Sequence, residues 1–193
     1  MQRRMTFQQY RTMDLCFFTI LLCVGEALIS FASTRWFPGE PYTLSLTPAI
    51  TAIVMVRWGM GGGIPALAGA LVLCLTSGAS GQQYAIYVLG NVTALALVPV
   101  LKRIGWKKLT GDVLLTLCYG LLAALLMQLG RFVAACLLGN APGVSAGFVT
   151  TDILSTLFSV LICWIARRQD GMLEEQMDYL IRIQRENEQD KGE

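Results

Sequence analysis

Residues 112–138 read DVLLTLCYGLLAALLMQLGRFVAACLL, a long apolar run in which Arg131 is the only charged side chain after Asp112. About 20 such residues cross the hydrocarbon core of a bilayer, so the run predicts a transmembrane helix. The short segment GNAPGV (139–144) ends it, and a second apolar run with Asp152 follows at 145–166. The stretch therefore predicts two antiparallel transmembrane helices that carry one charge of each sign inside the membrane.

The same pattern extends over most of the chain. The chain is 54% hydrophobic and 15% charged, whereas a soluble domain averages about a quarter charged residues. We therefore predict an all-α membrane protein with a membrane domain at 1–168 and a cytoplasmic amphipathic tail at 169–193. The domain is expected to hold six transmembrane helices, near residues 13–33, 44–57, 60–77, 84–103, 112–138 and 145–166.

The basic residues predict the orientation of these helices. The first, third and fifth connections between the predicted helices lie on one side of the membrane and hold a single basic residue, Arg35. The second and fourth connections lie on the other side with the two ends of the domain. That side holds ten basic residues: Arg3, Arg4, Arg11, Arg57, Lys102, Arg103, Lys107, Lys108, Arg167 and Arg168. Lys and Arg gather on the cytoplasmic side of membrane proteins. Both termini are therefore expected in the cytoplasm of a multi-pass protein of the cell membrane.

Several function classes are excluded by what the sequence lacks. It has no His, the commonest metal ligand and general base, and no G-x-x-x-x-G-K-[ST] loop for ATP. The six Cys lie in apolar segments without a C-x-x-C pair, which favours buried thiols over a metal site or disulfides. We expect no metal, no cofactor, no nucleic-acid partner and no enzymatic activity in this chain.

Four polar side chains fall at one depth in the predicted outer half: Glu26, Asn91, Arg131 and Asp152. A charge at membrane depth costs a few kcal/mol unless it faces the protein interior or a wet cavity. Two interpretations stay open. Arg131 and Asp152 form a structural ion pair that locks two helices, or the four residues line a polar binding pocket.

Neighbouring side chains favour the pocket. Tyr84, Tyr87 and Asn91 are spaced i, i+3, i+7 and share a helix face. Gln128 shares a face with Arg131, Phe148 shares one with Asp152, and Trp36 lies in an aromatic connection that is either a lid or an interfacial anchor. Arg suits a carboxylate or phosphate, carboxylates suit an amine, and aromatics suit a ring. We expect a small zwitterionic or ring-bearing metabolite as ligand.

Small residues repeat at spacings of four in the predicted helix 60–77, at Gly62, Ala66 and Ala70. This pattern lets two helices approach closely. It serves either packing inside the chain or docking of a partner helix.

The segments IVMVRWG (53–59) and YAIYVLGN (84–91), together with the six-helix layout, resemble the S components of energy-coupling factor (ECF) transporters. The resemblance covers residues 10–168. It implies a subunit that captures a vitamin-like compound from outside and associates with a T component and two ATPase subunits. It also implies docking through the first three helices, with Gly62, Ala66 and Ala70 as interface. The Ala-x-x-x-Ala pattern of the family's first helix is broken here, because the residue four positions after Ala27 is Phe31.

The alternative to a substrate-binding subunit of an importer is a membrane sensory module that signals through its C-terminal helix.

Overall fold

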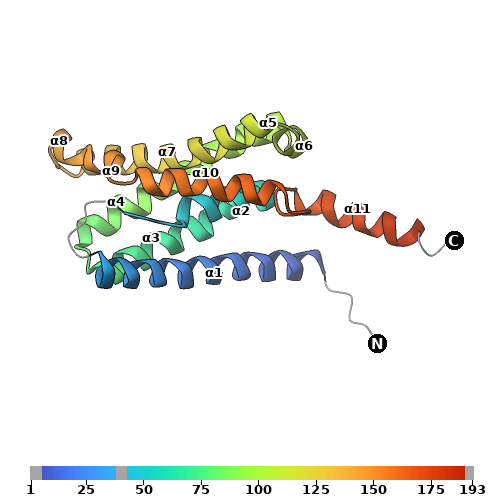
Figure 1. The fold of residues 1–193 in the computed structure, drawn as a ribbon, viewed down its shortest axis with the longest axis horizontal. Helices are drawn as coiled ribbons and strands as arrows, with labels where there is room; N and C mark the ends of the chain where they lie inside the picture. Colours follow the sequence, from blue (N-terminus) through green and yellow to red (C-terminus); the bar gives the residue numbers. More distant parts are fainter. Residues whose placement is uncertain (1–5, 38–42, 190–193) are drawn as a thin grey trace.

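The structure, a computed structural model, describes residues 6–37 and 43–189 and is all-helical over these residues. The long helices run side by side along the long axis of the molecule, and both ends of the described chain lie toward the same end (Figure 1). The elements are α1 (Phe7–Trp36), α2 (Thr47–Trp58), η1 (Gly59–Gly62), α3 (Gly63–Ser77), α4 (Gly81–Val92), η2 (Thr93–Leu97), α5 (Val98–Ile104), α6 (Trp106–Gly111), α7 (Val113–Leu137), α8 (Pro142–Ser145), α9 (Gly147–Thr150), α10 (Ile153–Arg167) and α11 (Gln176–Gln189).

Five helical segments of the described residues are long and apolar enough to cross a membrane. They are Phe7–Trp36, Thr47–Ser77, Gly81–Ile104, Val113–Leu137 and Pro142–Arg167. The second contains both α2 and α3, and the chain reverses inside it at Gly59, whose φ of 55° suits glycine. A Cβ on Gly62 would meet Met55, and one on Gly69 would meet Thr47. Such pairing shows that α2 and α3 form an antiparallel helical hairpin.

The short helix α2 lies at the centre of the bundle. It packs against α1, α3, α7 and α10, and every residue from Thr47 to Arg57 is buried. A helix that is apolar all round is expected in such a position. Its two ends are both held by α1, through Glu26 at the N-terminal end and Asp14 at the C-terminal end.

Glycine permits a close crossing of α4 and α7. A Cβ on Gly90 would lie 2.3 Å from Cγ and 2.6 Å from the backbone nitrogen of Arg131. A Cβ on Gly130 would lie 2.3 Å from the hydroxyl of Thr93. The two backbones can therefore approach only because neither position carries a side chain. This crossing sets the place of Arg131 against α4.

One end of the bundle is called the basic end here, because it carries Lys102, Arg103, Lys107, Lys108, Arg167 and Arg168.

The start of the C-terminal tail is held by Arg57. This residue donates two hydrogen bonds to Asp14 and one to the carbonyl of Gly171. Trp58 also donates to Asp14. The start of the tail is thereby fastened to α1 and α2.

The first part of the C-terminal tail packs against the bundle, whereas its last helix, α11, projects away from it (Figure 1). Leu173 and Gln176 are buried, and Gln176 accepts a hydrogen bond from Tyr10. Hydrogen bonds to Glu174 and Asp170 raise the pKa of Arg182. Beyond this point α11 continues past the basic end, roughly along the long axis (Figure 1).

The stripe of Gly62, Ala66 and Ala70 is used inside the chain. All three are buried, with no exposed surface on Ala66 or Ala70. The carbonyl of Ala66 accepts a hydrogen bond from Asn91. In this structure the stripe packs α3 against its own neighbours and offers no open surface to a partner.

Candidate functional site

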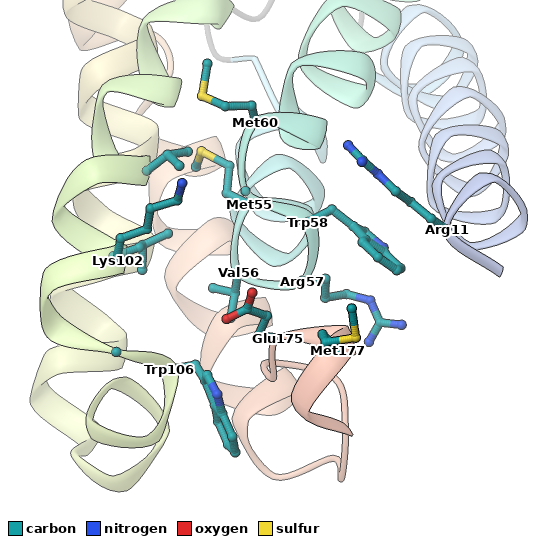
Figure 2. A pocket seen from close by; sticks show the side chains of 14 residues that line it. Arg11, Met55, Val56, Arg57, Trp58, Met60, Lys102, Trp106, Glu175 and Met177 are labelled. Carbon is teal, nitrogen blue, oxygen red and sulfur yellow. The ribbon is translucent and has the colours of Figure 1, made fainter. Parts of the chain in front are cut away.

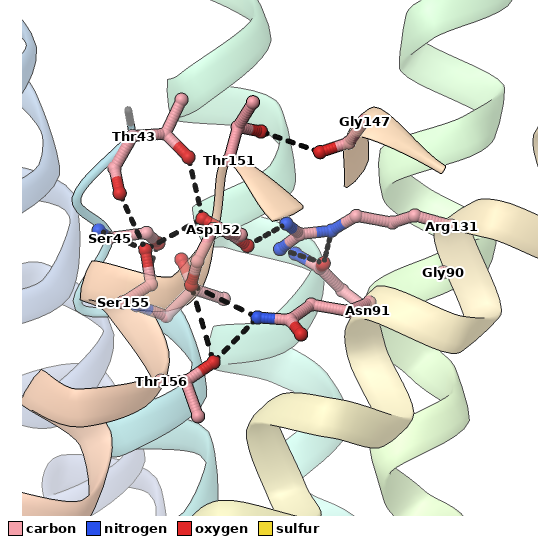
Figure 3. Close-up of polar contacts among 12 residues, drawn as sticks. Thr43, Ser45, Gly90, Asn91, Arg131, Gly147, Thr151, Asp152, Ser155 and Thr156 are labelled. Carbon is pink, nitrogen blue, oxygen red and sulfur yellow. Dashed lines mark hydrogen bonds and ion pairs between the residues drawn. The ribbon is translucent and has the colours of Figure 1, made fainter. Parts of the chain in front are cut away.

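A buried polar network joins five parts of the chain in the half of the bundle away from the basic end, and Figure 3 shows its contacts around Arg131 and Asp152. Its members come from α1, from residues 43–47, from α4, from α7 and from the start of α10. They are Glu26, Thr43, Ser45, Thr47, Asn91, Gln128, Arg131, Asp152, Ser155 and Thr156. Three of the four residues predicted to share one depth are in direct contact, and the fourth joins through serine side chains.

Arg131 lies at the centre of one half of the network. Its Nη1 donates to Asp152 Oδ2 at 2.6 Å. Its Nε and Nη2 both donate to the side-chain oxygen of Asn91, at 2.9 and 2.8 Å. Only 3% of the Arg131 side chain is exposed. The amide of Asn91 in turn donates to the carbonyl of Ala66, so α3, α4, α7 and α10 are linked through a single guanidinium.

Asp152 uses both carboxylate oxygens. Oδ2 accepts from Arg131, whereas Oδ1 accepts from the hydroxyls of Thr43 at 2.6 Å and Ser155 at 2.7 Å. Its backbone carbonyl accepts from Gln128. Hydrogen bonds of this kind offset the cost of burying an ion pair.

Glu26 differs from Asp152 because no described cation pairs with it. It is 1% exposed. Its Oε1 accepts from the hydroxyl of Ser45 at 2.5 Å, and from the hydroxyl and N–H of Thr47 at 2.7 and 2.9 Å. The N–H of Thr47 belongs to the first turn of α2, where free N–H groups and the helix dipole favour a negative charge.

Residues 43–47 connect the two halves. The N–H of Ser45 donates to the hydroxyl of Ser155, which itself donates to Asp152. The N–H of Thr43 donates to the carbonyl of Thr151. Thr43 is exposed, whereas Ser45 and Thr47 are buried. This short segment therefore covers the carboxylates from the outside of the bundle.

The other predicted site residues lie at different distances from the network. The ring of Tyr87 faces the Arg131 guanidinium at 4.8 Å, and Phe148 packs edge-on against that ring at 5.8 Å. Gln128 donates to Thr156 at 2.6 Å. Tyr84 is partly buried on α4, and its side chain makes no hydrogen bond to the described part of the network. Trp36 is 70% exposed at the end of α1 and is not joined to the described part of the network. Much of its predicted connection, residues 38–42, lies outside the described residues.

Sequence reasoning did not find Thr43, Ser45, Thr47 and Thr156. Short hydroxyl residues are common in connections and helices, and no spacing marks them. The one available signal was Glu26 itself, since a buried carboxylate without a cation requires several neutral donors.

The charged and amide side chains of the network are shielded from solvent, since Glu26, Asn91, Arg131 and Asp152 are each 3% exposed or less. None of these four residues lines any of the five surface pockets described for residues 6–37 and 43–189. No cluster of His, Cys, Asp and Glu suited to a metal occurs in 6–37 or 43–189. Neither a family model, nor a curated protein, nor a solved structure matches the chain significantly.

Proposed function

We propose that the chain is the substrate-binding S component of an ECF-type importer in the cell membrane, and that it captures a small zwitterionic metabolite at the buried network. In this proposal α2 and α3, which lie in one of the five apolar segments, count as two separate transmembrane helices, so the chain has six transmembrane helices. The basic end faces the cytoplasm together with both termini, as the distribution of Lys and Arg predicts. ATP hydrolysis belongs to two partner ATPase subunits, and a T component joins them to this chain.

The single observation that carries the proposal is the setting of Glu26. Asp152 is paired with Arg131, whereas Glu26 has no cation partner among the described residues. Glu26 instead binds only hydroxyl and N–H groups, all on one short segment. An ionisable residue kept at membrane depth is a functional residue by default. Its neutral partners are donors that a ligand ammonium can replace.

Residues 43–47 provide the route to the network. They bridge Glu26 and Asp152 from the side away from the basic end, and Thr43 is exposed. Displacing this segment opens a path to both carboxylates and to Arg131. The ligand amine then takes the place of the hydroxyls, its acidic group meets Arg131, and its ring packs near Tyr87.

Mass spectrometry of the purified chain tests the proposal. We expect a small polar metabolite to co-purify with the native protein. The variant Glu26→Gln keeps the shape of the side chain and removes its charge, so it should retain about tenfold less ligand, since a hydrogen bond to a charged group contributes about 1.5–3 kcal/mol. Glu188→Gln is the matched control, because Glu188 is exposed on α11, away from the network.

Two results would contradict the proposal. One is a native protein that retains no small molecule and binds none from a metabolite extract. The other is equal retention by the native chain and the Glu26→Gln variant.

The sensory module is a second candidate, favoured by one observation. The tail that leads into α11 is bound to both α1 and α2, through Tyr10 and Arg57. Movement of these helices would therefore reach a helix that extends past the bundle. ATP-dependent uptake by proteoliposomes that contain the chain, a T component and the ATPase subunits favours import. Ligand binding without any uptake favours sensing.

A further inference from the structure

A pocket of about 450 Å³ opens at the basic end, between α1 and α5 and in front of α2 (Figure 2). Its origin is the reversal of the chain at Gly59. Beyond this turn α3 packs between α1 and α4, and the pocket lies past the turn, where Arg11 of α1 and Lys102 of α5 line it on either side of α2 (Figure 2). The volume lies within the range of small-molecule sites.

The pocket has an apolar wall and a group of basic side chains. One part is apolar, with Met55, Met60, Val98 and Leu101. Arg11 and Lys102 reach toward the opening from α1 and α5 (Figure 2). Over the described residues neither cation takes part in an ion pair, whereas the third, Arg57, is held by Asp14. The pocket therefore presents two available cations beside an apolar wall.

Two tryptophans place this chemistry at a membrane surface. Trp58 and Trp106 both line the pocket, and the Arg11 guanidinium lies 5.8 Å from the centre of the Trp58 ring. Trp gathers at the boundary between the hydrocarbon and the water. Met60 is 62% exposed, so the apolar wall of the pocket reaches the outer surface of the bundle. A ligand that enters from the side must then be charged at one end and apolar at the other.

We propose that this pocket binds the phosphate-bearing headgroup of an anionic phospholipid. Arg11 and Lys102 bind the phosphate, and the methionines and Val98 pack against the glycerol and the first acyl carbons. Basic pockets between transmembrane helices bind anionic headgroups in this way. Glu175, the one carboxylate that lines the pocket, weakens the attraction. The site is separate from the polar network, so the proposal stands whichever metabolite the network binds.

Native mass spectrometry of the full chain, with phosphatidylglycerol or phosphatidylcholine added to the detergent, tests the assignment. The double variant Arg11→Gln/Lys102→Gln should retain about tenfold less phosphatidylglycerol, because each cation near a membrane surface strengthens the binding of anionic lipid. Phosphatidylcholine should be retained weakly by both proteins. The matched control is Arg103→Gln/Lys108→Gln, which removes two exposed cations of the same end that do not line the pocket. It should retain phosphatidylglycerol within about twofold of the native level, since its charges lie outside the pocket.

Glu175→Gln gives an independent test that does not remove a cation. It should raise the retention of phosphatidylglycerol about threefold, because a like charge leaves the site. An equal loss in both double variants would overturn the proposal, since it would reflect general surface charge. Competition by an excess of soluble glycerol phosphate that removes the lipid completely would also overturn it, since the pocket would then recognise a free anion.

Discussion

The structural role of Arg131 and the role in ligand binding that we propose for it can be separated by experiment. Its three donor groups are divided between Asp152 and Asn91, so the residue joins helices as well as presenting a charge. A structural role depends on satisfying these buried groups. A binding role depends on the charge itself. Substitution of the ion pair by apolar residues of similar size distinguishes the two.

Removing one member of the pair should be severe. Arg131→Met leaves the Asp152 carboxylate buried without its cation, which costs about 3–5 kcal/mol. Arg131→Met/Asp152→Leu should regain most of this stability, because no uncompensated charge remains. Thermal unfolding in detergent measures both.

Ligand affinity gives the second half of that test. The double variant should bind at least about tenfold more weakly than the native chain, since charged hydrogen bonds to the ligand are lost. Native affinity in a folded double variant would assign a structural role to the pair.

At the scale of helices, the crossing of α4 and α7 depends on the absence of a side chain at Gly90. Gly90→Ala places Cβ within 2.6 Å of the backbone of Arg131, so the helices must separate. Overpacking of this kind costs about 1–3 kcal/mol, and the shift of Arg131 should weaken ligand binding as well. Gly81→Ala, in the same helix with open space around it, should leave both unchanged. Unfolding temperatures for the two variants check the prediction.

The burial of Ala66 changes what a bulky substitution there should do. A docking surface would tolerate Ala66→Leu in the isolated chain, with only the partner lost. In the structure this side chain is fully buried beside the carbonyl that binds Asn91. We expect Ala66→Leu to lower the unfolding temperature and to weaken ligand binding, because the overpacked contact lies inside the chain. Native stability of this variant in detergent would contradict that expectation.

Over the whole molecule, hydropathy located the helices because length and apolar composition are properties of continuous sequence. Each predicted range is helical, within a few residues at most ends. The meeting of Asn91, Arg131 and Asp152 was predictable, since equal depth in adjacent antiparallel helices brings residues together. The position of residues 43–47 over the carboxylates was not predictable, because Ser and Thr residues outside a helix have no regular spacing that would indicate a shared face. The sequence also could not show that the Ala66 stripe faces inward, since the same pattern serves both uses.

The orientation in the membrane is tested by labelling. In a cysteine-free background, Ser80→Cys should react with an impermeant maleimide added outside intact cells. Asp170→Cys, at a position 70% exposed, should react only after the cells are opened. Arg3 and Arg4, which contribute to the predicted orientation, lie outside the described residues. Labelling of position 80 from the cytoplasm alone would reverse the orientation proposed here.

The length of α2 is constrained by α1, because Glu26 and Asp14 of α1 bind the two ends of α2. Asp14 and Glu26 are twelve residues apart on α1, and their partners Arg57 and Thr47 are ten residues apart on α2. These separations are about 18 Å and about 15 Å at 1.5 Å per residue, and the long Arg57 side chain spans the difference. One inserted residue would advance an end of α2 by about 1.5 Å and rotate it by about 100°, so either Thr47 would leave Glu26 or Arg57 would leave Asp14. The central helix can therefore exchange apolar side chains more easily than it can gain or lose a residue.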